Sequence, residues 1–429
     1  MNRLLFALVG VFLAGTLVSC GSNSSSAPSG SPGTKSNLAH RALVTNSISS
    51  TTFGTSVFIL DASQDKFTRF TLGSASSPQF MAVSPDKWFT LTFSGINNSI
   101  AVADNVKEAI VGVVNLSVGA ATSIAIQADD KVAYAALPDA PVLNGPNGVI
   151  LVMDIDLTRA KFAVVSRIPV PGVRKLEINA AGDRVLAFAA TSNTVTVIDT
   201  TKVSLTSADD SAAATFVGGF DRAVDGLFSA DGKTAYVFNC GAECGGAQSS
   251  VAQLDTTLYQ TTATLPVDSA TIGFLSGTSL YVAGSKPGTV CASGTAAAGC
   301  GQVSIVDTGS FTVKTSGILV TDGFHDHIET QSSKLFIGAT HCSEVDLSAS
   351  GGETRGCLSM LDTTANTVVV SPDKGGVTGI APIGGGRTVV YVIIGNELRI
   401  YDSTKSALID SRKQLDIIGA PVDVKYIDK

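Results

Sequence analysis

The sequence predicts an all-β protein made of one repeated unit, and three observations carry this prediction. First, an apolar, alternating run that ends in Asp occurs eight times, at Val57–Asp61, Ile100–Asp104, Ile150–Asp154, Val195–Asp199, Val251–Asp255, Val303–Asp307, Leu358–Asp362 and Leu398–Asp402. Second, the intervals between these Asp residues are 43, 50, 45, 56, 52, 55 and 40 residues, close to the length of a four-stranded propeller blade. Third, short Val/Ile/Thr/Phe runs alternate with Gly/Ser/Asp/Asn clusters, and no long stretch has the pattern of an amphipathic helix. We therefore predict a β-propeller.

The first 19 residues predict a lipoprotein signal peptide. Arg3 and the amino terminus form a short positive region, and the apolar run over residues 4–17 is too short to span a bilayer. The run is followed by the letters LVSC ending at Cys20, which resemble a bacterial lipobox, where cleavage exposes a diacylated Cys. An ordinary secretory signal with a chance Cys is the alternative. On the lipobox interpretation, Cys20 carries several acyl chains that anchor the protein stably to a membrane.

Residues 20–37 predict a flexible tether that carries the lipidated Cys20. The Gly/Ser/Pro-rich letters from Gly21 to Lys35 cannot bury a core and are typical of a flexible linker. A non-Asp residue after the lipidated Cys, here Gly21, is the pattern of many Gram-negative outer-membrane lipoproteins. We therefore expect residues 38–429 to form a propeller that is tethered in the cell envelope, at the outer membrane.

Residues 223–265 show the repeated unit most clearly. Its expected strands are Ala223–Ser229, Thr234–Asn239, Val251–Asp255 and Thr261–Leu265. The first two are joined by a tight turn in which Gly232 can take a positive φ. The phrases SPD at 84–86, SADGK at 229–233, YVFN at 236–239 and VIDT at 197–200 resemble the bacterial YVTN-type β-propeller repeat. This resemblance covers the chain from about residue 40 to its end and implies the propeller fold; it implies little about function.

The chain also predicts how the ring closes. The first unit has a second, third and fourth strand, at Ala42–Asn46, Val57–Asp61 and Phe67–Leu72, but no inner strand. After the last full unit, Val422–Asp428 alternates and occupies the place of an inner strand. We predict that it completes the first blade, because an open ring would expose two unpaired edges. The expected count is eight blades, with seven as the alternative if the first unit is not a blade.

Six cysteines follow Cys20, and an even number in an exported protein indicates disulfides. Each sequential pair falls between the second and third strands of one unit, so we expect the bridges Cys240–Cys244, Cys291–Cys300 and Cys342–Cys357. A metal-binding thiol cluster is the alternative. These connections share one face of a propeller with the loop at residues 137–148. One interpretation of that face is a recognition surface for a protein or for a small polar ligand. The alternative is that its loops have varied without a function and are kept intact by the disulfides.

One group of His and Glu residues could form a metal site. His325, His327 and Glu329 fall on one face of an extended strand, and His341 begins the cysteine-containing loop of the same unit. Two or three His with a carboxylate could bind a divalent transition metal such as Zn, Fe or Cu. Hydrogen-bonded polar residues at the channel rim are the alternative.

Other charged residues precede or begin inner strands and are expected at the channel mouth, where they can bind a small polar ligand or pair with one another. They are Arg174, Lys175, Asp221, Arg222, Asp225, Asp268, Asp373 and Lys374. With a net charge of −7 and no basic run, the chain lacks the positively charged patch that binds nucleic acid.

Three functions stay open. The favoured one is a membrane-tethered binding module that uses the disulfide-bearing face. A metal-dependent enzyme, similar to propeller lactonases and lyases, with its site near His325 and His327, and a structural envelope component are the alternatives.

Overall fold

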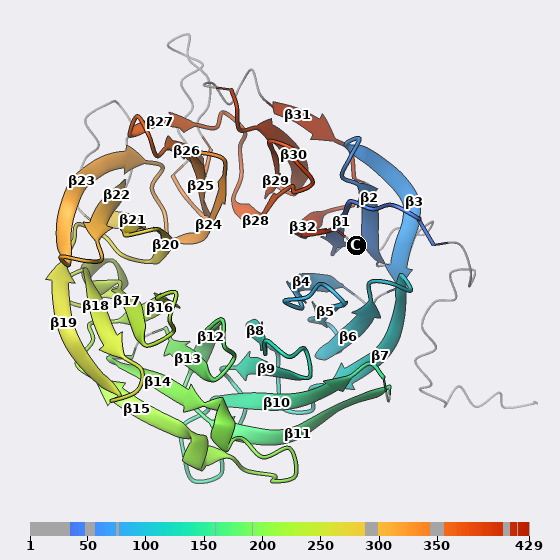
Figure 1. The fold of residues 1–429 in the computed structure, drawn as a ribbon, viewed down its shortest axis with the longest axis horizontal. Coiled ribbons are helices and arrows are strands. Elements are labelled where there is room, and N and C mark those ends of the chain that lie inside the picture. The colour runs from blue at the N-terminus through green and yellow to red at the C-terminus, as the bar shows by residue number, and fades with distance from the viewer. Residues whose placement is uncertain are drawn as a thin grey trace, which may run out of the picture.

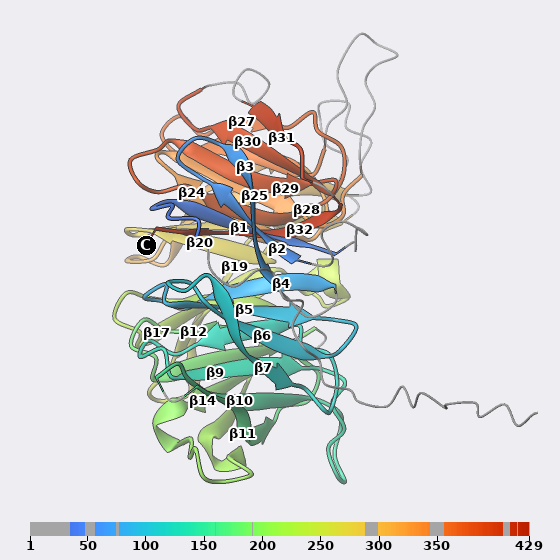
Figure 2. The ribbon, with the colours of Figure 1, turned by 90° about the vertical axis from the view of Figure 1, so that its right-hand side faces the viewer.

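The computed structural model describes residues 35–47, 56–73, 77–158, 160–190, 192–287, 299–343, 356–405, 412–417 and 419–428. The described strands form eight antiparallel sheets of four strands each, arranged as a ring around a central axis (Figure 1). Seen from the side, the ring is a thick disc (Figure 2). The predicted eight-bladed propeller is therefore confirmed. No helix in the described ranges is both long and apolar enough to cross a membrane.

The first four blades contain the following strands, given from the inside of the ring outward. Blade 1 consists of β32 (Pro421–Ile427), β1 (Arg41–Asn46), β2 (Ser56–Asp61) and β3 (Lys66–Gly73). Blade 2 consists of β4 (Pro78–Val83), β5 (Phe89–Ser94), β6 (Ser99–Asp104) and β7 (Ala109–Asn115). Blade 3 consists of β8 (Ser123–Ile126), β9 (Val132–Leu137), β10 (Val149–Asp156) and β11 (Lys161–Pro169). Blade 4 consists of β12 (Val173–Ile178), β13 (Arg184–Ala189), β14 (Thr194–Asp199) and β15 (Ala214–Gly218).

The other four blades follow in chain order. Blade 5 consists of β16 (Ala223–Phe228), β17 (Thr234–Asn239), β18 (Ser250–Asp255) and β19 (Gln260–Pro266). Blade 6 consists of β20 (Ile272–Ser276), β21 (Ser279–Pro287), β22 (Gly299–Asp307) and β23 (Thr312–Val320). Blade 7 consists of β24 (His325–Gln331), β25 (Lys334–Ala339), β26 (Leu358–Asp362) and β27 (Thr367–Val370). Blade 8 consists of β28 (Val377–Pro382), β29 (Val389–Ile394), β30 (Glu397–Asp402) and β31 (Arg412–Leu415). Among the described residues, three short 3-10 helices, η1 (Thr200–Lys202), η2 (Ser211–Ala213) and η3 (Gly241–Cys244), lie in connections.

The position of a strand within its blade explains its sequence. Every residue of the second strand β5 is buried, because neighbouring blades cover both of its faces, and such strands are continuous runs of apolar and small residues. The outer strand β19 has the sequence QTTATLP, in which exposed and half-buried residues alternate. The hydrophobic clusters lie between adjacent blades; one of them joins Phe93 of blade 2 to Leu151 of blade 3. The core is therefore a ring of interfaces between blades.

The recurring Asp at the end of the third strand is a turn former. One carboxylate oxygen of each of Asp104, Asp255, Asp307 and Asp362 accepts two backbone N–H groups, two and three residues on, at 2.8 to 3.1 Å. These bonds start the turn to the outer strand and favour the charged form of the carboxyl group. Lys314 and the N–H of Ser310 lower the pKa of Asp307 to about 2. The feature that revealed the repeat is thus a structural device.

The chain closes the ring as predicted. Strand β32 pairs with β1 in antiparallel register from Arg41 opposite Ile427 to Val44 opposite Val424. Figure 1 shows this last strand inside the first blade, between β28 and β4. Side chains reinforce the junction between blades 8 and 1: Arg387 donates to both carboxylate oxygens of Asp65, which also accepts the Tyr391 hydroxyl at 2.7 Å. The closed ring fixes the eight inner strands around one channel.

Candidate functional site

The central channel contains a cavity of about 520 Å³, and all eight inner strands contribute to its wall. Its charged and titratable residues are Lys175, Glu177, Asp225, Asp326, His327, Glu329, Asp423 and Lys425. Hydroxyl groups come from Thr122, Ser123 and Thr378, and apolar contacts come mainly from Met81, Ile272 and Ile380. A concave site with a few convergent polar groups is the usual form of a small-molecule site.

Bulges at the beginning of the inner strands decide which residues enter the channel. The register shifts by one residue between Val173 and Lys175, between Ala223 and Asp225, and between His325 and His327. Each bulge inserts an unpaired residue, so the side chains on either side of it face opposite ways. As a result Lys175, Asp225 and His327 line the cavity, whereas Val173, Ala223 and His325 are fully buried in the blades.

Lys175 is the centre of one charged group. Its ammonium lies 2.6 Å from a carboxylate oxygen of Asp225 on the next blade and 3.5 Å from one of Glu177 on its own strand. Burial by itself lowers the pKa of Lys175, but the two carboxylates outweigh it and the net pKa is raised. Burial also raises the pKa of both Glu177 and Asp225, and Lys175 only partly offsets that effect. The single positive charge of Lys175 therefore does not fully offset the effect of burial on the two carboxyl groups.

A second charged group lies on β24 and β32. His327 Nδ1 is 2.7 Å from Asp326, whose other carboxylate oxygen accepts the hydroxyl of Thr340. Although burial alone raises the pKa of Asp326, the bonds from His327 and Thr340 lower it overall. Partial desolvation inside the channel raises the pKa of Glu329, with Lys425 and His327 acting in the opposite direction. Glu329 is exposed to the channel and makes no ion pair with any described residue.

The structure corrects the expectation that His325, His327 and Glu329 share one face. His327 and Glu329 do face the channel together, but the bulge at Asp326 turns His325 to the other side, where it is 0% exposed. Burial lowers the pKa of His325 to about 4, with the backbone of Thr321 and the charge of Asp326 acting weakly in the opposite direction. Period-two alternation could not reveal this, because the bulge leaves no mark in the hydrophobic pattern.

The remaining member of the predicted metal set, His341, is exposed in the loop after β25. His325, His327, Glu329 and His341 are thus divided among the blade interior, the channel and the rim. Within the described ranges, no group of three or more His, Cys, Asp or Glu side chains is arranged to hold a metal ion. The described geometry gives no support to a metal centre at these residues.

Of the eight residues expected at the channel mouth, only Lys175 and Asp225 line the cavity. Asp221 accepts the N–H groups of Ala247 and Gln248, each at 2.7 Å, and Asp268 pairs with Lys286 at 3.0 Å. Asp373 is 8% exposed and accepts the Tyr401 hydroxyl at 2.8 Å. These three acids therefore stabilise the fold through hydrogen bonds and an ion pair. Sequence reasoning missed Glu177, Asp423 and Lys425, although Glu177 and Lys425 are each two residues beyond another channel residue on the same strand.

Two of the three expected disulfides are present, Cys240–Cys244 and Cys342–Cys357. Cys291 lies outside the described residues, as does the side chain of Cys300. The first bridge closes the loop that contains η3, whose Glu243 accepts the backbone N–H of Ser285 on the next blade at 2.8 Å. This loop therefore bridges blades 5 and 6 on the face where the inner strands begin.

A separate hollow of about 640 Å³ lies between blades 2 and 3, lined by turns of the opposite face. Trp88, Val106 and Leu157 contribute apolar wall, and Asp130 lies beside Asp86 across the seam between the blades. Both carboxylate oxygens of Asp130 are buried, and the interactions with Asp86 do not offset the cost of that burial. Burial, followed by the neighbouring Asp86, raises the pKa of Asp130 to about 7.

Comparisons with known proteins identify the fold alone. No family model and no curated protein matches the chain. Among solved structures, a dihydro-heme d1 dehydrogenase, NirN, is similar with a TM-score of 0.62 and 14% identity over 92% of this chain and 76% of the other. Hydrazine synthase from Kuenenia stuttgartiensis has a TM-score of 0.55 and 14% identity over 80% of this chain and 96% of the other. The β-propeller domain of Cps50 (Swd1) from Myceliophteria thermophila has a TM-score of 0.50 and 9% identity, covering 75% of this chain and 94% of that one. Identities this low carry no function with them.

Proposed function

We propose that this protein is a non-catalytic binding module of the cell envelope, anchored through Cys20, that takes up a small, positively charged polar ligand. The ligand enters the central channel from the disulfide-bearing face. The observation that carries the proposal is the excess of acid on the channel wall. Five carboxyl groups and two lysines line the cavity, so the wall carries a charge of −3 when all five carboxyl groups are ionised and His327 is neutral.

The internal ion pairs leave this excess in place. Lys175 is shared between Asp225 and Glu177, and Lys425 lies 3.4 Å from Asp423, which leaves Glu329 without an ion-pair partner among the described residues. Burial raises the pKa of Glu177, Asp225 and Glu329 alike. A bound cation would stabilise the charged form of these carboxyl groups, and the partly enclosed cavity would strengthen that attraction relative to bulk water.

The disulfide-bearing face supplies a stiff entrance. The loop closed by Cys240–Cys244 is fixed to the next blade through Glu243 and Ser285, and the N–H of Ser343, beside Cys342, donates to Asp322 at 3.0 Å. A stiff entrance reduces the ordering cost that a ligand has to overcome. No observation favours the metal-dependent enzyme over this proposal.

Calorimetric titration of the purified full-length protein with 1,4-diaminobutane tests the ligand class, with neutral 1,4-butanediol as the matched probe. We expect the diamine to bind and the diol not to bind. Glu329→Gln should weaken diamine binding several-fold, because it removes a channel charge without breaking an ion pair. The control Glu397→Gln removes a carboxylate outside the channel, at the exposed start of β30 where it pairs with Arg399, and should bind the diamine as the wild type does. Equal binding of diamine and diol, or an unchanged Glu329→Gln variant, would contradict the proposal.

The anchor is tested separately by Cys20→Ser in cells given a labelled fatty acid. Wild-type protein should carry the label and sediment with membranes, whereas the variant should carry none. Labelled Cys20→Ser protein would remove the lipid anchor from the proposal and leave the channel experiment unaffected.

A further inference from the structure

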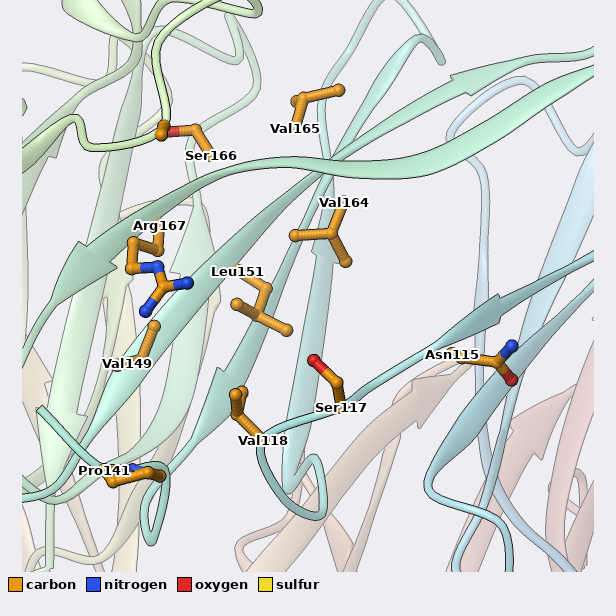
Figure 3. A pocket seen from close by; sticks show the side chains of 11 residues that line it. Asn115, Ser117, Val118, Pro141, Val149, Leu151, Val164, Val165, Ser166 and Arg167 are labelled. Atoms are coloured by element: carbon orange, nitrogen blue, oxygen red, sulfur yellow. The ribbon is translucent and has the colours of Figure 1, made fainter.

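A third cavity, distinct from the channel, lies near the outer rim of the ring between blades 2 and 3 (Figure 3). We call it the rim pocket; its volume is about 250 Å³. One wall comes from β10 and β11, and the other from Asn115, Ser117 and Val118 at the end of blade 2. Pro141, in the long loop that the sequence marked for possible recognition, lies at its edge.

A bulge in β11 decides which side chains face the rim pocket. Strand β11 pairs with β10 with a register shift that leaves Val165 unpaired, so Ser166 turns to the blade 4 side and Arg167 turns to the blade 2 side. Arg167 is paired with Leu151 and therefore shares a face with Leu151 and Val149. In Figure 3 its guanidinium lies beside these two side chains, and Val164 lies on the same side of the strand.

Arg167 is held in place by its backbone, while its side chain has no hydrogen-bond or ion-pair partner among the residues that the structure describes. The N–H of Asp210, just before η2, donates to the carbonyl oxygen of Arg167 at 3.0 Å, so this connection covers the outer edge of β11. Asp210 directs a carboxylate oxygen to the N–H of Ser204 and makes no ion pair with Arg167. By contrast, Arg41, Arg184, Arg387 and Arg399 each pair with a carboxylate.

The charge of the rim pocket is unusual for this molecule. None of its lining residues is acidic, and Arg167 is the one charged residue among them, in a chain whose net charge is −7. An arginine fork beside an apolar wall is suited to a carboxylate, which it can bind through two parallel hydrogen bonds. Ser117 and Asn115, on the opposite wall, add hydrogen-bond donors that are exposed and accessible.

The geometry points to a site for a small organic carboxylate with a branched apolar body. Arg167 binds the carboxylate, and Leu151, Val149 and Val164 contact the apolar part. A volume of about 250 Å³ equals about eight waters at their share of liquid volume, enough for an acid of roughly six carbons. The same chemistry is presented by a free branched-chain acid and by the C-terminal leucine of a peptide.

The test is calorimetric titration of the full-length protein with 4-methylpentanoate and with N-acetyl-alanyl-leucine, which distinguish the two sources. The neutral 4-methylpentanamide and plain acetate are the matched probes for the charge and for the apolar body. We expect at least one of the two larger acids to bind, and the amide and acetate to bind at least tenfold more weakly. Whichever of the two acids binds more tightly identifies the source.

Arg167→Gln should weaken the binding of that acid at least tenfold. Arg174→Gln, an exposed arginine outside the rim pocket, should leave it unchanged. Both variants should melt as the wild type does, because neither arginine side chain has a partner to lose among the described residues. Binding of acid and amide with equal affinity, no binding of either acid, or full binding by Arg167→Gln would overturn the assignment. Because the rim pocket takes an anion and the channel a cation, failure of one does not imply failure of the other.

Discussion

At the scale of single residues, the chain reuses Asp for different tasks, and position decides which. Asp255 at the end of β18 accepts the hydroxyl of Thr257 and two backbone N–H groups, and these hydrogen bonds lower the pKa of its carboxyl group. Asp225 accepts the Gly226 N–H and pairs with Lys175 in the channel. Asp130, in the turn between β8 and β9, has φ 60° and buried carboxylate oxygens beside Asp86. Sequence alone shows the Asp but cannot show what surrounds it.

The Asp130 carboxyl group predicts a pH-dependent loss of stability. Burial, then Asp86, raises its folded-state pKa from 3.8 to about 7, so the folded protein binds this proton more tightly than the unfolded chain does. Stability from this group is therefore complete below about pH 4 and is lost as pH rises toward 7. Asp130→Asn, which keeps the shape and suits a positive φ, should be more stable than the wild type at pH 8, by on the order of 1 kcal/mol, but not at pH 4.

Urea unfolding at pH 4 and pH 8 measures this difference, with the exposed Asp139→Asn as the control. A wild-type-minus-variant difference that is the same at both pH values would show that the pKa of Asp130 does not change on folding, contrary to this prediction.

At the scale of elements, most strands could be predicted because two signals agree. Alternation and tight turns together predicted the ends of β16 to β19 to within a residue or two of the observed ends. The site could be predicted only in part. The channel is lined, as expected, by Lys175, Asp225, His327 and Glu329. By contrast, a bulge turns His325 away from the channel, and local hydrogen bonds hold Asp221 and Asp373 outside it. Bulges depend on how blades pack around the axis, which a single strand does not encode.

The disulfide loops give an element-scale prediction. In the entropic model, a bridge stabilises more when it closes a longer loop, so Cys342–Cys357, with a separation of 15, should contribute about 3 kcal/mol and Cys240–Cys244, with a separation of 4, about 2. We expect the Cys342→Ser/Cys357→Ser pair to lower the free energy of unfolding more than Cys240→Ser/Cys244→Ser does. Urea unfolding of both variants under identical buffer checks the order. The reverse order would show that the packing of Glu243 against blade 6, rather than loop length, dominates.

At the scale of the whole molecule, closure by the last strand is what makes one body of eight sheets. One hydrophobic cluster contains Val44 of blade 1, Tyr391 of blade 8 and Val424 of β32. The same strand contributes Asp423 and Lys425 to the channel wall, so the tail completes both the ring and the candidate site. The sequence predicted this closure because an inner strand was missing at one end and left over at the other.

Thermal melting of the full-length protein beside a variant lacking residues 422–429 tests this closure most directly. The deletion removes most of β32 and exposes the edge of β1, so we expect a large drop in melting temperature, loss of a single cooperative transition and a tendency to aggregate. Val424→Asp, a charge placed at a fully buried position of the same strand, should lower the melting temperature in the same direction, whereas Lys425→Ala should change it little. A truncated protein that melts like the full-length one would contradict the closed ring and, with it, the channel that all eight inner strands enclose.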